Sequence, residues 1–144
     1  MKVSDLMGSR REVFAISEES TVLEAARYLQ EKQVRAAGVV DASGKVVGVL
    51  AHSDIADKVV TKNQCPGWVK VSDIMTRTLF TVNPREHFEV GLQLMEQQGV
   101  HHLVIVDDNN EFLGMLSVND LLKAMVSDEK ERADVLESYV FAVR

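Results

Sequence analysis

Two segments of the chain carry residue types that could hold a sugar and a phosphate. Gly48 to Asp54 and Gly114 to Asp120 each resemble a strand that ends in a small polar turn, with a carboxylate in the first turn of a helix. Ser117 would lie where the strand passes into the helix, near free backbone N–H groups that bind phosphate oxygens. Asp120 would present two acceptor oxygens to the hydroxyls of a ribose, each bond being worth ~1.5–3 kcal/mol.

The alternative is that the two carboxylates only stabilise the starts of their helices. An acidic residue in the first turn interacts favourably with the helix dipole, by ~0.3–1 kcal/mol. Asp54 and Asp120 occur at the same place in two related segments. This recurrence favours a ligand site over the alternative.

Both segments belong to an internal duplication. The motif VSDLM at residues 3–7 returns as VSDIM at residues 71–75, an offset of 68 residues. Residues 34–55 return as residues 100–121, an offset of 66 residues. Two blocks in the same order at nearly one offset indicate a repeated unit. A half of this size buries too little surface alone, so the halves are expected to share a core and form a cleft with pseudo-two-fold symmetry.

Each half is predicted to run strand, helix, strand, turn, strand and helix. Short apolar segments at 13–16 and 79–82 predict the first strands. The return strands at 46–50 and 112–116 are apolar throughout, which is typical of strands buried on both faces. The expected fold class is α/β (α+β), with two β-α-β-β-α repeats packed sheet to sheet.

Helix-capping residues predict where the helices begin. Thr21 is a good N-cap, and Glu24 lies three residues later, where it closes a capping box. Pro84 suits the first turn of the corresponding helix in the second half. The second helix of each half is expected to begin after Ser53 and after Asn119, which are both acceptable N-caps.

The composition excludes several classes of protein. Of the 144 residues, 46% are hydrophobic and 26% are charged, which is unlike a disordered chain. The net charge is −6 and the sequence has no Lys/Arg cluster, so we expect no nucleic-acid partner. The apolar runs are far shorter than the about 18 residues needed to cross a bilayer, and the N-terminus shows no secretory signal. We therefore expect a cytoplasmic protein with no membrane partner.

Catalytic and metal-binding patterns are missing from the sequence. The four histidines, His52, His87, His101 and His102, lack the spacing of a zinc-hydrolase helix. There is no G-x-S-x-G motif, and the one cysteine, Cys65, lies in a Cys-Pro-Gly turn and cannot form an internal disulfide. We therefore expect no metal site, no catalytic residue and no enzymatic activity.

In order along the chain, these features resemble a tandem pair of CBS (cystathionine-β-synthase) domains, an arrangement called a Bateman module. The resemblance runs from Val3 to about Val126. It rests on the VSDLM and VSDIM openings, the LFTVNP entry into a helix, the VHHLVIVDD strand and the GMLSVND segment that ends at Asp120. It divides the chain into a first repeat at 1–62, a linker at 63–70, a second repeat at 71–126 and a C-terminal helical tail at 127–144.

The resemblance implies a stand-alone regulatory module that binds an adenosine nucleotide between its halves without turnover. The implied ligand is AMP, ADP or ATP, with S-adenosylmethionine or an NAD-type molecule as further possibilities, and no cofactor is obligatory. Family members commonly pair, so we expect a homodimer that uses the apolar helix faces at 22–29 and 88–95, with a separate protein partner receiving the response. The alternative is a ligand-free structural or protein-interaction module that acts through its dimer or a partner.

Carried over residue by residue, the resemblance implies two unequal sites. Ser117 and Asp120 match the family's hydroxyl-plus-carboxylate pattern in the second half. In the first half Asp54 matches, but Ala51 stands where a serine or threonine is expected. We therefore expect the second half to hold the better nucleotide site, and the first to be weak, empty or suited to a nucleoside with fewer phosphates.

Basic and apolar residues complete the expected site. Family members often carry Arg or His aimed at phosphate where His101 and His102 precede a strand, and Arg35 matches His101 in the first half. Because adjacent strand residues point to opposite faces, only one histidine is expected to meet a ligand. Phosphate raises the pKa of a neighbouring histidine, so affinity is expected to fall between about pH 6 and 8, and His101→Ala to flatten that dependence. Leu79, Phe80 and Val82 could pack against an adenine, although ordinary core packing is the alternative.

Two segments outside the repeats have weaker patterns. Apolar residues recur at helical spacing in the tail, which predicts a helix that packs on this chain or on a partner. They are Leu136, Tyr139, Val140 and Val143. Trp68, Val69 and Val71 follow the linker and are expected to pack under the second half and not to form a stacking platform for bases.

Overall fold

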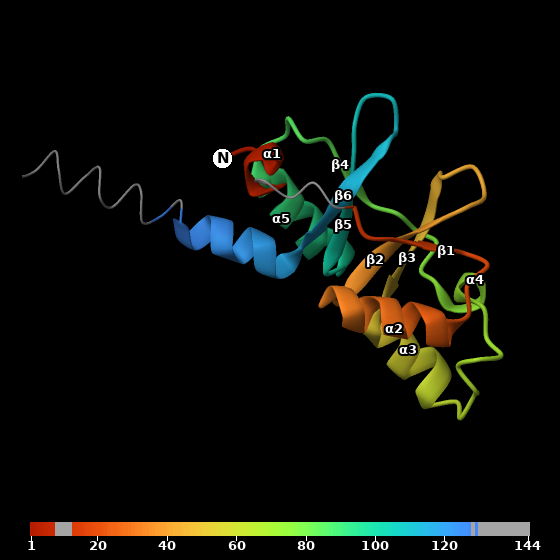
Figure 1. The fold of residues 1–144 in the computed structure, drawn as a ribbon. Helices are drawn as coiled ribbons and strands as arrows, with labels where there is room; N and C mark the ends of the chain where they lie inside the picture. Colours follow the sequence, from red (N-terminus) through yellow and green to blue (C-terminus); the bar gives the residue numbers. More distant parts are fainter. Residues whose placement is uncertain (8–12, 128, 130–144) are drawn as a thin grey trace, which may run out of the picture.

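The fold consists of two halves, each with one three-stranded sheet and its helices (Figure 1). The structure is a computed structural model that describes residues 1–7, 13–127 and 129. In each sheet the first strand is parallel to the second, and the third is antiparallel to the second. The strands are β1 (Ala15–Ser17), β2 (Ala36–Val40) and β3 (Val46–Ala51), then β4 (Thr81–Val82), β5 (His102–Val106) and β6 (Phe112–Ser117). The predicted fold class is confirmed.

The long helices α2 (Val22–Lys32) and α5 (Phe88–Gln98) occupy equivalent places in the two halves. Helix α2 begins as predicted, because Thr21 Oγ1 accepts a hydrogen bond from Glu24 N at 3.2 Å. Helix α5 begins four residues after Pro84, with His87 at its N-cap. The prediction placed its start too early, because residues 83–86 form a separate turn, in which Glu86 Oε1 accepts from the backbone N–H of Asn83 at 3.1 Å.

The second helix of each half begins directly after its third strand. In the first half α3 (His52–Ile55) runs into the π-helical turn η1 (Ala56–Val60), and in the second half a helix covers residues 118–127. The N-cap of α3 is Ala51, so the predicted cap at Ser53 is wrong, and the helix after β6 likewise starts before Asn119. The chain turns into each helix as soon as its β-strand ends, even where a poor capping residue is present.

The opening motif of each half packs on the other half. Helix α1 (Val3–Met7) lies beside α5, and its Val3 N donates to Glu86 O at 2.8 Å (Figure 1). Helix α4 (Val71–Ile74) completes the first-half core, and its Val71 N donates to Ser20 O at 2.8 Å. Val3 and Val71 are both fully buried in these exchanged positions. The packing units therefore cross the boundaries of the sequence repeats.

The expected roles of three apolar surfaces are corrected by this packing. The helix faces at 22–29 and 88–95, expected to be available to a dimer, lie inside the two cores; Val22, Leu29, Phe88 and Met95 are at most 4% exposed. Val69 and Val71 pack in the first-half core and not under the second half, because Val69 precedes the exchanged helix α4 and Val71 begins it. Trp68 is 87% exposed and packs under neither half.

The two sheets approach each other where β2 meets β6. A Cβ atom added to Gly38 would lie 2.5 Å from Cζ of Phe112, so the phenyl ring fills the space above the glycine. A larger residue at position 38 would collide with that ring. The halves are thus held together directly as well as through the exchanged helices.

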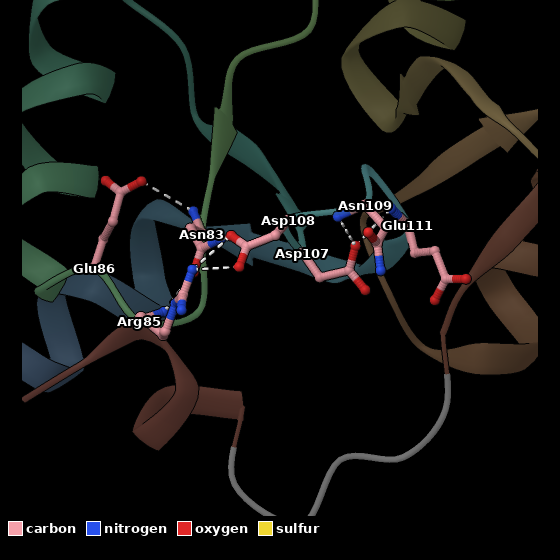
Figure 2. Close-up of polar contacts among 7 residues, drawn as sticks. All are labelled: Asn83, Arg85, Glu86, Asp107, Asp108, Asn109 and Glu111. Atoms are coloured by element: carbon pink, nitrogen blue, oxygen red, sulfur yellow. Dashed lines mark hydrogen bonds and ion pairs between the residues drawn. The ribbon is translucent and has the colours of Figure 1, made fainter.

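The hairpin turns are held by aspartates, and the second is also linked to the loop before α5. Asp41 Oδ1 and Asp107 Oδ1 each accept two backbone N–H groups from their own turn, at 2.9–3.0 Å. Arg85 binds both oxygens of Asp108, at 2.5 and 2.6 Å, and Asn83 Nδ2 donates to Asp108 at 2.8 Å (Figure 2). These groups are exposed, so the network adds little stability.

Two sequence expectations concern the chain ends and membranes. The predicted tail helix, with Leu136, Tyr139 and Val140, lies outside the described residues. Among the residues that the structure describes, no helix has the length and apolar character needed to cross a bilayer.

Candidate functional site

A cavity of about 730 Å³ lies between the halves and is lined by residues of both. The first half contributes residues of β2, β3 and α3, and the second contributes residues 78–80, the strands β5 and β6, and the helix that follows. The structure brings most of the sequence-predicted site residues to this cavity: Arg35, Asp54, Phe80, His101, His102, Ser117 and Asp120.

Val82 is the exception among the predicted site residues. It does not line the cavity, and it is 2% exposed within the second-half core. Strand β4 pairs Val82 with Ile105, which places the side chain among the core residues beneath α5. An apolar strand residue has the same sequence signature whether it lines a cavity or a core, and here it lines the core.

The second-half corner is a complete capping box. Ser117 N donates to Asp120 Oδ2 at 3.0 Å, and Asp120 N donates to Ser117 Oγ at 3.1 Å. This reciprocal pair satisfies two N–H groups that the helix itself leaves without partners. Because the hydroxyl oxygen accepts from Asp120 N, its proton is directed elsewhere and can be donated to an anion. The corner is therefore held rigidly at the cavity wall.

The first-half corner keeps the carboxylate but has no hydroxyl. Ala51 N donates to Asp54 Oδ2 at 2.9 Å, which matches the bond from Ser117 N in the second half. Asp54 Oδ1 also accepts from Lys58 Nζ at 3.0 Å and from Thr76 Oγ1 at 3.3 Å. Asp54 is only 9% exposed, and these three donors compensate for the water that its carboxylate loses on burial.

Strand register places a histidine beside the second-half hydroxyl. His102 lies directly opposite Ser117 in the antiparallel pair of β5 and β6, and Ala36 lies opposite Ala51 in the first half. Directly opposed residues of an antiparallel pair project from the same face of the sheet. The second half thus presents an imidazole and a hydroxyl where the first presents two methyl groups. Sequence reasoning missed this pairing, which the length of the hairpin turn could have indicated.

The histidine pair meets the cavity differently from the sequence prediction. Both His101 and His102 line it, whereas strand alternation predicted that only one would face a ligand. His101 precedes β5, which begins at His102, so alternation does not apply to it. Burial lowers the pKa of His102, as does neighbouring His101, while the carboxylates of Asp120 and Asp54 oppose this shift. Burial therefore favours the neutral form of the His102 imidazole.

Apolar side chains supply the rest of the wall, together with polar residues that sequence reasoning did not select. Phe80 and Leu79 lie on the second-half side with Val100 and Met115. The polar residues that were missed are Lys123, His52, Ser53, Thr76 and Thr78. Lys123 follows Asp120 by three residues, and this helical spacing could have identified it. A mostly apolar cavity with a few convergent polar groups is typical of a small-molecule site.

The described residues offer no candidate metal centre. Within residues 1–7, 13–127 and 129, no three His, Cys, Asp or Glu side chains come close enough together to hold a metal ion.

Comparison with known sequences gives two matches to one family. The CBS domain matches residues 3–61 and 71–127. Protein MJ1232 of Methanocaldococcus jannaschii is 35% identical over 123 residues, which cover 85% of this chain and 39% of MJ1232. The CBS domain-containing protein YhcV of Bacillus subtilis is 33% identical over 127 residues, which cover 88% of this chain and 87% of YhcV. This chain thus spans less than half of the first relative and most of the second.

Solved structures of the same fold cover most of the chain. A protein with CBS domains from Burkholderia ambifaria has a TM-score of 0.82 and 25% identity, and the match covers 89% of this chain and 96% of that one. The CBS domain protein PAE2072 from Pyrobaculum aerophilum, complexed with AMP, has a TM-score of 0.76 and 24% identity, covering 83% and 89%. The CBS domain pair of MJ0100 is in complex with 5′-methylthioadenosine and S-adenosyl-L-methionine. It has a TM-score of 0.77 and 22% identity, and the match covers 87% of this chain and 99% of that one.

Proposed function

The chain belongs to the CBS-domain family, and we propose that it is a regulatory module that binds an adenosine nucleotide between its halves without turnover. CBS-domain pairs are regulatory ligand binders. The observation that carries the proposal is the second-half corner, where Ser117, Asp120 and His102 meet at one wall of the cavity between the halves.

Each part of a nucleotide has a counterpart at this corner. Asp120 accepts from the ribose hydroxyls, and the hydrogen bond from Ser117 N fixes the orientation of its carboxylate. The Ser117 hydroxyl and the two histidines face the phosphate, which the N-terminus of the helix over 118–127 also favours. Phe80 and Leu79 pack against the adenine. The proposed role of these groups is to bind the nucleotide without a reaction.

Binding at this place can be transmitted because the cavity includes both halves. A ligand shifts a conformational equilibrium only by its different affinity for the two states. Residues 76–80, which connect the exchanged helix α4 to β4, contribute Thr76, Thr78, Leu79 and Phe80 to the wall. A nucleotide seated on the second half therefore contacts the segment that crosses from the first half, and any relative movement of the halves changes its contacts.

The ligand class draws support from proteins of the same fold. PAE2072 is complexed with AMP, and MJ0100 with 5′-methylthioadenosine and S-adenosyl-L-methionine. For this chain we propose AMP, ADP or ATP, with S-adenosylmethionine and NAD as the other compounds to test. A ligand at 100 times its Kd adds ~2.7 kcal/mol to stability, which raises Tm by about 5–10 °C in a chain of this size.

A thermal-shift screen of these five compounds tests the proposal. We expect at least one to raise Tm in the wild type, and the rise to shrink strongly in Asp120→Asn while persisting in His87→Gln, which lies outside the cavity lining. If no adenine compound shifts Tm at millimolar concentration, the ligand-binding function is excluded.

Exposed apolar residues favour a second role as an interaction module, in a homodimer or with a protein partner. Val60 is 66% exposed and Val126 is 63% exposed, at equivalent places in the two halves. Leu122 and Met125 are 44% and 38% exposed on the same helix as Val126. We propose that these helix surfaces form the dimer, in place of the faces expected from sequence. Sedimentation analysis should show a dimer that Val60→Asp and Val126→Asp dissociate, whereas a monomeric wild type would contradict this role.

A further inference from the structure

Trp68 is held in solvent by a backbone that is fixed on both sides of it. Its side chain is 87% exposed, more than that of any other large apolar residue that the structure describes. Pro66 O, two residues earlier, accepts from Leu23 N at 3.1 Å, and Val69 O, the next residue, accepts from Val22 N at 2.8 Å. Tryptophan is highly buried on average in folded proteins. Here the start of α2 holds the indole ring at the surface, where it adds nothing to the core.

A surface groove of about 370 Å³ lies beside this ring. Trp68 and Val69 supply apolar surface to it, and Lys58, Lys62 and Asp73 supply charged groups. None of these residues lines the cavity between the halves. Apolar surface with a polar rim is typical of a site where another molecule docks.

The charged groups of the groove leave one ammonium group for a partner. Lys58 Nζ lies 3.0 Å from Asp54 Oδ1, and Asp73 Oδ2 accepts from Lys70 N at 3.3 Å. Lys62, four residues after Lys58, is exposed and forms no ion pair with any residue that the structure describes. Its ammonium group is therefore available to a carboxylate of another molecule.

Charge and apolar surface together indicate the kind of occupant. The wall of the groove carries two ammonium groups and one carboxylate, whereas the whole chain has a net charge of −6. An acidic segment would therefore find its favourable charge here and repulsion over much of the remaining surface. Tryptophans that are surrounded by polar groups are among the residues that contribute most to binding in protein interfaces.

We propose that the groove beside Trp68 docks a segment of a partner protein in which acidic residues flank apolar side chains. An apolar side chain packs on the indole ring, and a carboxylate pairs with Lys62 Nζ. The groove is separate from the cavity between the halves, so this inference goes beyond the proposed nucleotide site and does not depend on it.

Fluorescence gives a direct test, because Trp68 is the one tryptophan of the chain and its emission reports on this groove alone. The probe is a short blocked peptide of glutamates around two leucines, titrated into the full chain without nucleotide. The emission maximum should move to shorter wavelength and saturate, with a Kd of about 1 mM or below. The same peptide with lysines in place of the glutamates should leave the emission unchanged.

Substitutions separate the contribution of the ring from that of the ammonium group. Trp68→Ala should lose the binding that calorimetry detects in the wild type, and Trp68→Phe, which keeps an aromatic ring, should retain part of it. Lys62→Met should weaken binding about two- to fivefold, and Lys62→Glu about tenfold. Lys45→Met, in the exposed hairpin turn outside the groove, is the control and should change nothing. Circular dichroism checks that each variant folds.

The outcomes distinguish the possible occupants. An unchanged emission maximum at millimolar peptide, or equal binding of the lysine peptide, would overturn the docking site and leave the proposed function in place. An emission maximum that moves with the concentration of the chain alone would assign the groove to a second copy. A shift with phosphatidylserine vesicles and none with the acidic peptide would assign it to a membrane surface. Either of these results would overturn the acidic partner.

Discussion

The two halves start the same helix at the same corner with different side chains. In the first half Ala36 and Ala51 lie opposite each other, and in the second half His102 and Ser117 do. Both helices begin normally, because in each the aspartate carboxylate accepts a hydrogen bond from the backbone N–H at the end of the strand. The first half thus shows that this helix start requires neither the hydroxyl nor the imidazole. Their presence at the second-half cavity wall is better explained by a ligand than by the fold.

The largest loss of AMP affinity should come from a substitution of Asp120 and not from the same substitution of Asp54. Asp120→Asn keeps an oxygen that can accept from Ser117 N but loses the charge that holds the ribose, so AMP affinity should fall about 10- to 150-fold. Asp54→Asn is the matched variant in the first half and should change affinity less than about twofold. Isothermal titration calorimetry measures both. Equal losses from the two substitutions would remove the distinction between the halves.

A smaller effect should identify the phosphate donor. Ser117→Ala removes the hydroxyl and should weaken AMP binding about tenfold while leaving adenosine binding nearly unchanged. Ser53→Ala, at the cavity wall of the first half, is the control and should alter neither. Ser117→Ala also removes an N-cap, which costs ~0.5–2 kcal/mol of stability, so binding to this variant is measured well below its Tm. An equal loss for AMP and adenosine would show that the hydroxyl serves only the helix.

The histidine beside Ser117 should make binding depend on pH. Burial and His101 hold the pKa of His102 below its ordinary value, and a bound phosphate would raise it. The complex then binds more protons than the free chain, so AMP affinity should be highest in acid and fall severalfold as pH rises from about 6 to 8. His102→Gln should flatten the curve. Comparison with His101→Ala shows which imidazole contributes more, and a wild-type curve without slope would exclude both.

The smallest effect should appear in the first half, without any ligand. Ala51→Ser supplies the hydroxyl that would complete the capping box with Asp54, and it should raise the free energy of unfolding by ~0.5–1 kcal/mol. Urea denaturation measures this change, with Ala36→Ser on the facing strand as the control. A loss of stability would show that the two corners differ in backbone geometry and not only in side chains.

Local sequence patterns predicted the parts of the fold that local interactions determine. The duplication, the hairpins and the cap at Thr21 follow from spacing and residue type. The exchange of α1 and α4 could not be predicted, because Val3 and Val71 have the same chemistry and would fill either core equally well. The N-cap of α3 at Ala51 was missed because the end of β3 determines it, against the capping preference of Ser53.

The polar residues of the candidate site could be predicted from the sequence, because an apolar strand has little structural need for them. Ser117, Asp120 and the histidines stand out because polar residues interrupt an apolar strand end. Val82 could not be distinguished from a cavity residue, because burial in a core and packing against a ligand both select apolar side chains. The pair of Asp54 and Lys58 has helical i, i+4 spacing, but its link to Ile74 depends on the exchanged α4 and so on the tertiary structure.

The proposed function places an adenosine nucleotide in the cleft at the second-half corner. Amide chemical shifts from ¹H–¹⁵N spectra, followed during an AMP titration, test it most directly. Binding at this corner should give saturable shifts that are largest at residues 101–102 and 117–120 and small at 51–54. Shifts centred on 51–54, shifts confined to surfaces away from the cleft, or no shifts at millimolar AMP would contradict it.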